Sequence, residues 1–123
     1  MISIITPTFN RKDQVIKSIK SSLDLIKNIK GEIIIIDDAS NDGTYNFLLK
    51  NLKQEIKKKI IKLLRLKKNI GVTGARNAGA KKSIYKWIIF LDSDDTFISK
   101  ISNEFKSRLI KLRKFDLIFF RCL

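Results

Sequence analysis

The chain of 123 residues contains no histidine, and it has only one cysteine, Cys122, and one proline, Pro7. A single cysteine excludes an internal disulfide, and the lack of histidine argues against a zinc site or a histidine-based catalytic triad. Any acid–base or metal chemistry therefore falls to carboxylates. No apolar run approaches the roughly 20 residues that cross a bilayer, and residues 1–5 carry no charged leader. We therefore expect a cytoplasmic chain without a signal segment or a membrane-spanning helix.

Acidic residues are scarce: 12 Asp and Glu face 26 Lys and Arg, and the net charge is +14. Such an excess attracts polyanions, whether nucleic acid, acidic lipid headgroups or the phosphates of a nucleotide. Most of the basic residues are lysines that lie between apolar helix positions, where a solvated face would put them, so we expect no specific nucleic acid partner. Charge alone leaves open two hypotheses: peripheral association with the inner face of an anionic membrane, and a non-enzymatic polyanion-binding module.

Two apolar runs, residues 2–6 and 32–37, show no polar alternation. Strands that are apolar on both faces are typical of a parallel sheet covered by helices. Between these runs, apolar residues recur at helical spacing and predict an amphipathic helix that ends near Gly31. Its predicted stripe is Val15, Ile19, Leu23 and Ile26. These segments together form a β-α-β unit.

The alternation of strands and helices continues to the end of the chain. The predicted elements are a helix over 45–56 after the turn at Asp42, a strand over 60–66, a helix over 74–83 capped by Thr73, a strand over 87–91, a helix over 98–112 and a strand over 115–123. This order predicts an α/β fold, a three-layer sandwich with a mostly parallel central sheet. With no repeat or linker, residues 1–123 are expected to form a single domain.

Polar segments follow three of the predicted strands, at residues 6–8, 37–38 and 92–95. Ligands of open parallel sheets bind beyond the carboxyl ends of the strands, so we expect these segments to line one cleft. Within Asp92-Ser93-Asp94-Asp95, carboxylates about 4 Å apart would repel by about 4 kcal/mol at an effective dielectric near 20. One Asp would suffice to cap a turn. Three of them favour a divalent cation held through oxygen ligands.

Two further segments contain candidate binding residues. Asp38 lies where the second strand meets the cleft and is a candidate to accept hydrogen bonds from a nucleobase or ribose hydroxyl. Asp37 could equally be satisfied by amides of its own loop, and Asp42 is expected to serve the turn. Arg76 lies near a glycine-rich helix start, which favours an anion, and could bind a phosphate bidentately. Gly79 could serve only to let that helix pack closely on the sheet.

Four segments together resemble the motifs of the family 2 glycosyltransferases, in that family's order and spacing, over residues 1–98. They are TPTFNR at 6–11, IDDASNDGT at 36–44, GARN at 74–77 and FLDSDD at 90–95. The resemblance implies a GT-A-type fold that binds a nucleotide-diphospho-sugar, a UDP-sugar first of all.

The resemblance also implies roles for individual residues. Thr6 and Asp38 are expected near the base and ribose of the donor, and Asp92-Ser93-Asp94 matches the family's DxD element. Asp94, with Asp92, is the candidate ligand of Mg²⁺ or Mn²⁺ against the diphosphate. The remaining candidates for nucleotide-sugar binding are Pro7, Arg76 and Ser93.

The implied reaction is inverting transfer of the sugar to a glycan or lipid-linked acceptor, in which a cation stabilises the leaving diphosphate and a carboxylate base activates the acceptor hydroxyl. In the family that base lies well beyond the DxD element. Here only 28 residues follow Asp95, and their acids are Glu104 and Asp116. We therefore expect residues 1–123 to be the donor-binding domain without the C-terminal acceptor-binding half, and to catalyse little or no transfer alone.

Overall fold

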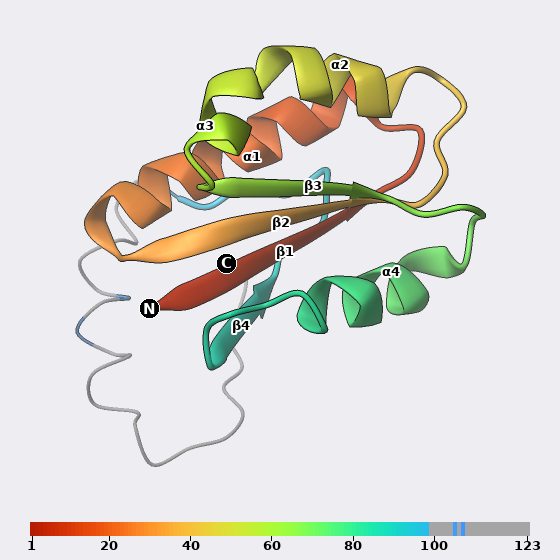
Figure 1. Ribbon diagram of the computed structural model, residues 1–123. Coiled ribbons are helices and arrows are strands. Elements are labelled where there is room, and N and C mark those ends of the chain that lie inside the picture. The colour runs from red at the N-terminus through yellow and green to blue at the C-terminus, as the bar shows by residue number, and fades with distance from the viewer. Residues whose placement is uncertain (99–104, 106, 108–123) are drawn as a thin grey trace.

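The computed structural model describes residues 1–98, 105 and 107, and it confirms the α/β architecture. Helices α1, α2 and α3 cover one face of the sheet and α4 the other, so the fold has three layers (Figure 1). All strands are parallel, in the order β3-β2-β1-β4. Along the chain the elements are β1 (Ile2–Thr8), α1 (Lys12–Asn28), β2 (Gly31–Asp37), α2 (Thr44–Asn51), α3 (Lys53–Lys57), β3 (Ile61–Arg65), α4 (Gly71–Ala80) and β4 (Trp87–Phe90).

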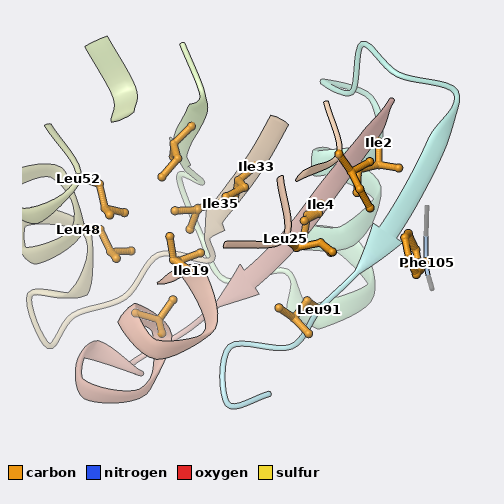
Figure 2. Close-up of a cluster of buried hydrophobic side chains, with 13 residues drawn as sticks. Ile2, Ile4, Ile19, Leu25, Ile33, Ile35, Leu48, Leu52, Leu91 and Phe105 are labelled. Atoms are coloured by element: carbon orange, nitrogen blue, oxygen red, sulfur yellow. The ribbon is translucent and has the colours of Figure 1, made fainter. Parts of the chain in front are cut away.

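The central strands β1 and β2 are buried on both faces, as their uniform apolar sequence predicts. Ile33 and Ile35 of β2 belong to the cluster under α1 and α2, which Figure 2 shows with Ile19. Ile34 and Ile36 point to the opposite face, since successive side chains of a strand alternate, and they pack with Ala75 of α4. Each fully buried isoleucine contributes about 1.5–3 kcal/mol, so these two strands fix the sheet's centre.

The helix predicted over 45–56 is divided into α2 and α3, because Leu52 leaves the helical conformation (φ −111°, ψ 18°). The leucines of this segment are only partly buried. Leu48 and Leu52 pack into the cluster of Figure 2, whereas Leu49 is exposed. Breaking the helix at Leu52 keeps this side chain in the core while the chain turns back toward β3.

The first strand does not end at Pro7, as the sequence suggested, but continues to Thr8. Proline is tolerated here because the pairing of β1 with β4 ends at Ile5. On the side of β2, the hydrogen bond at this end of β1 is accepted by the carbonyl of Thr8 from the amide of Asp38, so it does not need an amide hydrogen at Pro7. The lack of an amide hydrogen at Pro7 therefore removes no bond from the ladder with β4.

Helix α4 begins at Gly71 rather than after Thr73, so the prediction of Thr73 as the cap is wrong. The N-cap residue, Ile70, has no capping side chain of its own. Instead the carboxylate of Asp38 accepts from the amides of Ile70 and Gly71, both at 2.9 Å. A capping group that lies more than thirty residues away in the chain is invisible to local capping rules.

Strand β4 is apolar along its whole length, yet its Ile88 and Phe90 are 37% and 46% exposed. Within the described part of the chain, β4 pairs only with β1 and forms one edge of the sheet. Ile98, where a helix was expected to begin, is not helical, whereas Phe105 and Ser107 are; the rest of the helix expected over 98–112 and the strand expected over 115–123 lie outside the described residues. None of the described helices is long and apolar enough to cross a membrane.

Candidate functional site

A groove of about 340 Å³ lies at the carboxyl edge of the sheet. Strands β1, β2 and β3 succeed one another in one direction, whereas β4 lies on the other side of β1, so the order of strands reverses between β1 and β4. Such a reversal leaves a crevice between the loops that leave the two strands, and ligands of open α/β sheets bind there. The groove is lined by Pro7, Thr8, Phe9, Arg11, Asp38, Val72, Ala75, Asp92, Ser93 and Asp94.

The acidic segment after β4 is a tight turn in which the amide of Asp95 donates to the carbonyl of Asp92 at 3.0 Å. Helix α1 holds this turn from behind, since the Ser18 hydroxyl donates to the same carbonyl at 3.2 Å. Ser93 is buried, and the carboxylates of Asp92 and Asp94 on either side of it line the groove. Asp95 is not among the lining residues, so two of the three predicted carboxylates belong to the site.

An arginine from a distant segment pairs with each of these two carboxylates. Nη2 of Arg76 donates to Oδ1 of Asp92 at 2.6 Å, and the same guanidinium lies 5.6 Å from the centre of the Phe90 ring. Nη1 of Arg11 donates to Oδ2 of Asp94 at 2.9 Å. The repulsion expected among the aspartates is thus offset by guanidinium groups. From the sequence, Arg76 was expected to bind phosphate, and Arg11 had no expected role of its own.

The acidic pair after β2 has a structural function in this arrangement. Asp37 is fully buried and accepts from the amide of Ser40 at 3.3 Å, with Nε of Arg65 at 3.4 Å. The expectation that its own loop satisfies Asp37 is therefore confirmed in part, with Arg65 as the missed partner. Asp38 lines the groove, but both of its carboxylate oxygens accept from the amides at the start of α4.

Asp42 serves the turn before α2, as expected. Its Oδ1 accepts from the amide of Thr44 at 2.9 Å and from the Thr44 hydroxyl. Burial acts to raise the pKa of Asp42, but hydrogen bonds from Thr44 and from the backbone amides of Lys12 and Asp42 together outweigh it, and the pKa is lowered.

The loop after β1 is held against the loop after β2 by a reciprocal pair of hydrogen bonds. The amide of Asn10 donates to the Ser40 hydroxyl, and the amide of Asn41 donates to Oδ1 of Asn10, both at 2.9 Å. Asn10 has a φ of 50°, which asparagine tolerates better than most residues. The pair fixes the backbone immediately before Arg11 and thereby directs this arginine toward Asp94.

Only part of the first predicted binding segment, residues 6–8, reaches the groove. Pro7 and Thr8 line the groove, whereas the side chain of Thr6 is fully buried within β1 and is not part of the lining. The hydroxyls of Thr6 and Thr8 are both buried without a hydrogen-bond partner among the described residues. The apolar walls formed by Phe9, Val72 and Ala75 were missed, since single apolar residues in loops and helices carry no sequence signal for a ligand.

The donor atoms at the groove suit a hard divalent cation. Carboxylate oxygens are the protein ligands that Mg²⁺ and Mn²⁺ prefer, and Mg²⁺ commonly uses one or two of them together with substrate phosphates. Over residues 1–98, 105 and 107, no three acidic, histidine or cysteine side chains group closely enough to hold a metal. Asp92 and Asp94 therefore fit a cation that a diphosphate helps to bind.

The family described as Glycosyl transferase family 2 matches residues 3–102, so the chain belongs to the family 2 glycosyltransferases. The chain is 47% identical over 98 residues to an uncharacterised glycosyltransferase, RC0461, of Rickettsia conorii, of which it covers 15%. It is 39% identical over 108 residues to the UDP-Glc:alpha-D-GlcNAc-diphosphoundecaprenol beta-1,3-glucosyltransferase WfaP of Escherichia coli. These alignments cover 78% and 85% of this chain. Since only 39% of WfaP is covered, the chain spans well under half the length of these relatives.

Solved structures confirm the fold as GT-A-type. The crystal structure of S. aureus TarS 1-349 in complex with UDP-GlcNAc matches 89% of this chain with a TM-score of 0.74 and 24% identity, and the match covers 31% of that structure. The mannosyltransferase PcManGT from Pyrobaculum calidifontis, in complex with GDP-Man and Mn²⁺, matches 81% of this chain and 29% of its own, with a TM-score of 0.72 and 18% identity. At such identities the likeness concerns the fold alone.

Proposed function

We propose that this chain is the donor-binding domain of a glycosyltransferase that transfers a sugar from a nucleotide-diphospho-sugar to a glycan or lipid-linked acceptor. The observation that carries this proposal is the groove at the strand-order reversal, where an acidic turn meets two arginines. The donors named for WfaP, TarS and PcManGT are all nucleotide-diphospho-sugars, and two of the three are UDP-sugars. A UDP-sugar is therefore the expected donor, and WfaP's named acceptor supports a lipid-linked one.

Within the proposed site, the nucleoside half of the donor lies against Pro7 and Thr8, close to Asp38 at the end of β2. Because Asp38 already accepts two backbone hydrogen bonds, its role is to shape this end of the groove by fixing the start of α4. Thr6 stays a prediction for the base-binding region. The diphosphate lies against the turn at Asp92-Ser93-Asp94, where Asp94 and Asp92 would hold Mg²⁺ or Mn²⁺.

The bound cation would act as a Lewis acid that stabilises the negative charge developing on the departing diphosphate. Asp92 is held in place by Arg76 on one side and by the Ser18 contact to its carbonyl on the other. Inverting transfer also needs a carboxylate base near the acceptor. Among the residues that the structure describes, the groove offers no acid beyond Asp38, Asp92 and Asp94, and Glu104 and Asp116 lie outside that part of the chain. The base is therefore proposed to lie outside this chain, which transfers little or no sugar alone.

Titration calorimetry of this chain with UDP and with GDP, with and without Mn²⁺, tests the proposal. We expect nucleotide binding that depends on the cation and that Asp94→Asn weakens. Asp24→Asn is the matched control, because Asp24 forms an exposed pair with Lys27 on α1 and does not line the groove. Equal binding by wild type and Asp94→Asn would remove the assignment of Asp94, and no binding of either nucleotide would refute the donor-binding function.

We also propose that the opposite edge of the sheet attracts an anionic membrane. The loops that enter the parallel strands all lie there, and contacts such as the Ile2 amide donating to the carbonyl of Lys30 hold them together. These loops contain the exposed lysines Lys30, Lys58, Lys59, Lys81, Lys82 and Lys86 and the exposed apolar residue Ile84. Each lysine near such a surface contributes about 1 kcal/mol of attraction.

Flotation with vesicles that contain anionic lipid tests this contact. We expect binding that falls as salt rises, and weaker binding when Lys81, Lys82 and Lys86 are changed to Gln. Vesicles of neutral lipid are the control. Binding that is equally strong to both vesicle types would contradict the electrostatic basis, and binding to RNA but not to vesicles would favour the polyanion-binding alternative.

A further inference from the structure

The two arginines at the groove differ in how firmly they are held. Arg76 forms a 2.6 Å contact to Asp92, in a pair whose side chains are 35% and 44% exposed, and its guanidinium also lies over the Phe90 ring, a second contact that fixes it. Arg11 has contacts of 2.9 Å to Asp94 and to Oε1 of Gln14, in a pair whose side chains are 43% and 50% exposed. Exposed ion pairs contribute little stability, so the contact between Arg11 and Asp94 exchanges at low cost.

The position of Arg11 suits a phosphate ligand. It lines the groove with Asp94, and it follows a backbone segment that Asn10 and Ser40 fix by hydrogen bonds. A guanidinium group matches phosphate oxygens as well as carboxylate oxygens, because both accept two parallel hydrogen bonds from its planar fork. Arg11 can therefore change partners within the groove by a movement of its side chain alone.

The charges at the groove couple the binding of a diphosphate to the binding of a divalent cation. Asp38, Asp92 and Asp94 bring three negative charges against the two positive charges of Arg11 and Arg76. A diphosphate alone meets a net negative groove, and a free cation must compete with Arg11 for Asp94. Together the two ligands remove both obstacles, since the phosphate receives Arg11 as Asp94 becomes available to the cation.

We propose that Arg11 is a diphosphate-binding residue that holds Asp94 until the nucleotide arrives, and then moves from the carboxylate to a phosphate oxygen. The ligand class is a nucleoside diphosphate with a divalent cation, so the inference rests on the proposed function. Arg76 stays on Asp92 and serves as a positioning residue. The exchange makes Mn²⁺ and the nucleotide bind with positive coupling and keeps free metal from occupying the site.

Calorimetry and Mn²⁺ electron paramagnetic resonance on this chain test the exchange with Arg11→Gln. Removal of the competing guanidinium should let Mn²⁺ alone bind about threefold more tightly. The same change should weaken UDP binding in the presence of Mn²⁺ about tenfold, because a charge-assisted hydrogen bond to phosphate is lost. Opposite signs for the two ligands are the signature of the exchange. A general loss of structure would weaken both.

Lys12→Gln is the matched control, because it removes the same charge one position along, at a side chain that lies near Phe47 and does not line the groove. It should leave both affinities within about twofold of wild type. Arg11→Lys, which keeps the charge without the planar fork, should give intermediate UDP binding and covers the case in which Arg11→Gln does not fold.

The outcomes separate the two proposals. If wild type binds UDP with Mn²⁺ but the Arg11 variants behave like Lys12→Gln, the exchange is refuted and the donor-binding function stands. Loss of UDP binding without any gain in Mn²⁺ affinity would also refute the exchange. If wild type binds no nucleotide in any condition, both proposals fall.

Discussion

The two edges of the sheet use basic residues in different ways. At the carboxyl edge the three arginines of residues 1–98 each pair with an aspartate, as Arg11–Asp94, Arg65–Asp37 and Arg76–Asp92. At the amino edge the loops carry mainly exposed lysines, and one buried acid, Glu32, pairs with Lys62 at 2.7 Å. Arginine offers a planar fork that matches carboxylate and phosphate, whereas lysine offers a point charge. The carboxyl edge therefore holds its arginines in defined ion pairs, whereas the amino edge presents a diffuse positive surface.

Glu32 is the centre of the amino edge and shows how one acid can hold several elements together. Its side chain is 3% exposed, and Oε1 accepts from the Ser3 hydroxyl at 2.7 Å and from the Ile84 amide at 2.8 Å. Lys62 also donates to the carbonyl of Lys82. The starts of β1, β2, β3 and the chain before β4 thus meet at one carboxylate. The carboxyl edge instead distributes its contacts over three separate pairs.

The largest effect is expected for Glu32→Ala, which should lower the free energy of unfolding by about 3 kcal/mol, since it removes the partner of Lys62 and the acceptor of the buried Ser3 hydroxyl and of the partly buried Ile84 amide. Urea denaturation followed by circular dichroism measures the loss. Asp24→Ala is the control: its exposed pair with Lys27 should contribute less than about 0.5 kcal/mol. Equal losses of unfolding free energy in the two variants would show that the buried contacts of Glu32 stabilise the fold no more than an exposed ion pair does.

The Glu32 carboxylate should also make the free energy of unfolding depend on pH. Burial acts to raise the pKa of Glu32, but hydrogen bonds from the Ile84 amide, from Lys62 and from Ser3 outweigh it, and the pKa lies below its ordinary value of 4.5. Because the pKa of Glu32 is lower in the folded protein than in the unfolded chain, its ionised form stabilises the fold at pH values above the ordinary pKa of 4.5. This stabilisation is lost as the pH falls through the pKa of Glu32 in the folded protein.

Urea midpoints of wild type should therefore fall as pH drops below about 4.5, and those of Glu32→Gln should fall less. The loss cannot exceed that of Glu32→Ala, because protonation keeps the side chain in place. Glu55→Gln, on α3, is the control for the removal of one carboxylate elsewhere in the chain. If the curves of wild type and Glu32→Gln are parallel from pH 7 to pH 3, the ionised form of Glu32 does not stabilise the fold.

A smaller effect is expected at the carboxyl edge from Asp38→Ala, which removes the acceptor of the Ile70 amide and the nearer of the two acceptors of the Gly71 amide. We expect a loss of about 2 kcal/mol and faster hydrogen exchange at Ile70 and Gly71. Asn69→Ala is the control, since it removes the exposed hydrogen bond of 3.1 Å from the Gly71 amide and leaves both bonds to Asp38 in place. Unchanged exchange in Asp38→Ala would mean that α4 begins independently of β2.

The smallest effect is expected from Gly79→Ala, near the other end of α4. A Cβ at Gly79 would clash with Cγ2 of Ile5 and approach Cγ1 of Ile36 to 3.3 Å. Overpacking should outweigh the gain in helix propensity and leave a net loss of about 1 kcal/mol. Asn77→Ala, on the exposed side of the same helix, is the control and should not destabilise. A gain in stability from Gly79→Ala would mean that α4 moves freely on the sheet.

Local sequence patterns predicted the elements whose burial is periodic. The uniform isoleucines of β2 and the spacing of Val15 and Ile19 in α1 led to the right structures, because burial on two faces or one stripe leaves a direct pattern in the chain. The start of α4 and the break at Leu52 were not predictable in this way. The first depends on Asp38 in another strand, and the second on where the chain must turn to reach β3.

The sequence alone determined that the acids after β2 and β4 share one edge with the end of β1, because parallel strands have their carboxyl ends together. Only the tertiary structure decided their partners. Arg11 meets Asp94 across 83 positions and Asp38 meets Gly71 across 33, and such pairings depend on how helices dock on the sheet. Charge and spacing record neither the rotation of a helix nor the direction of a side chain, so they could place the acids without identifying the groups that balance them.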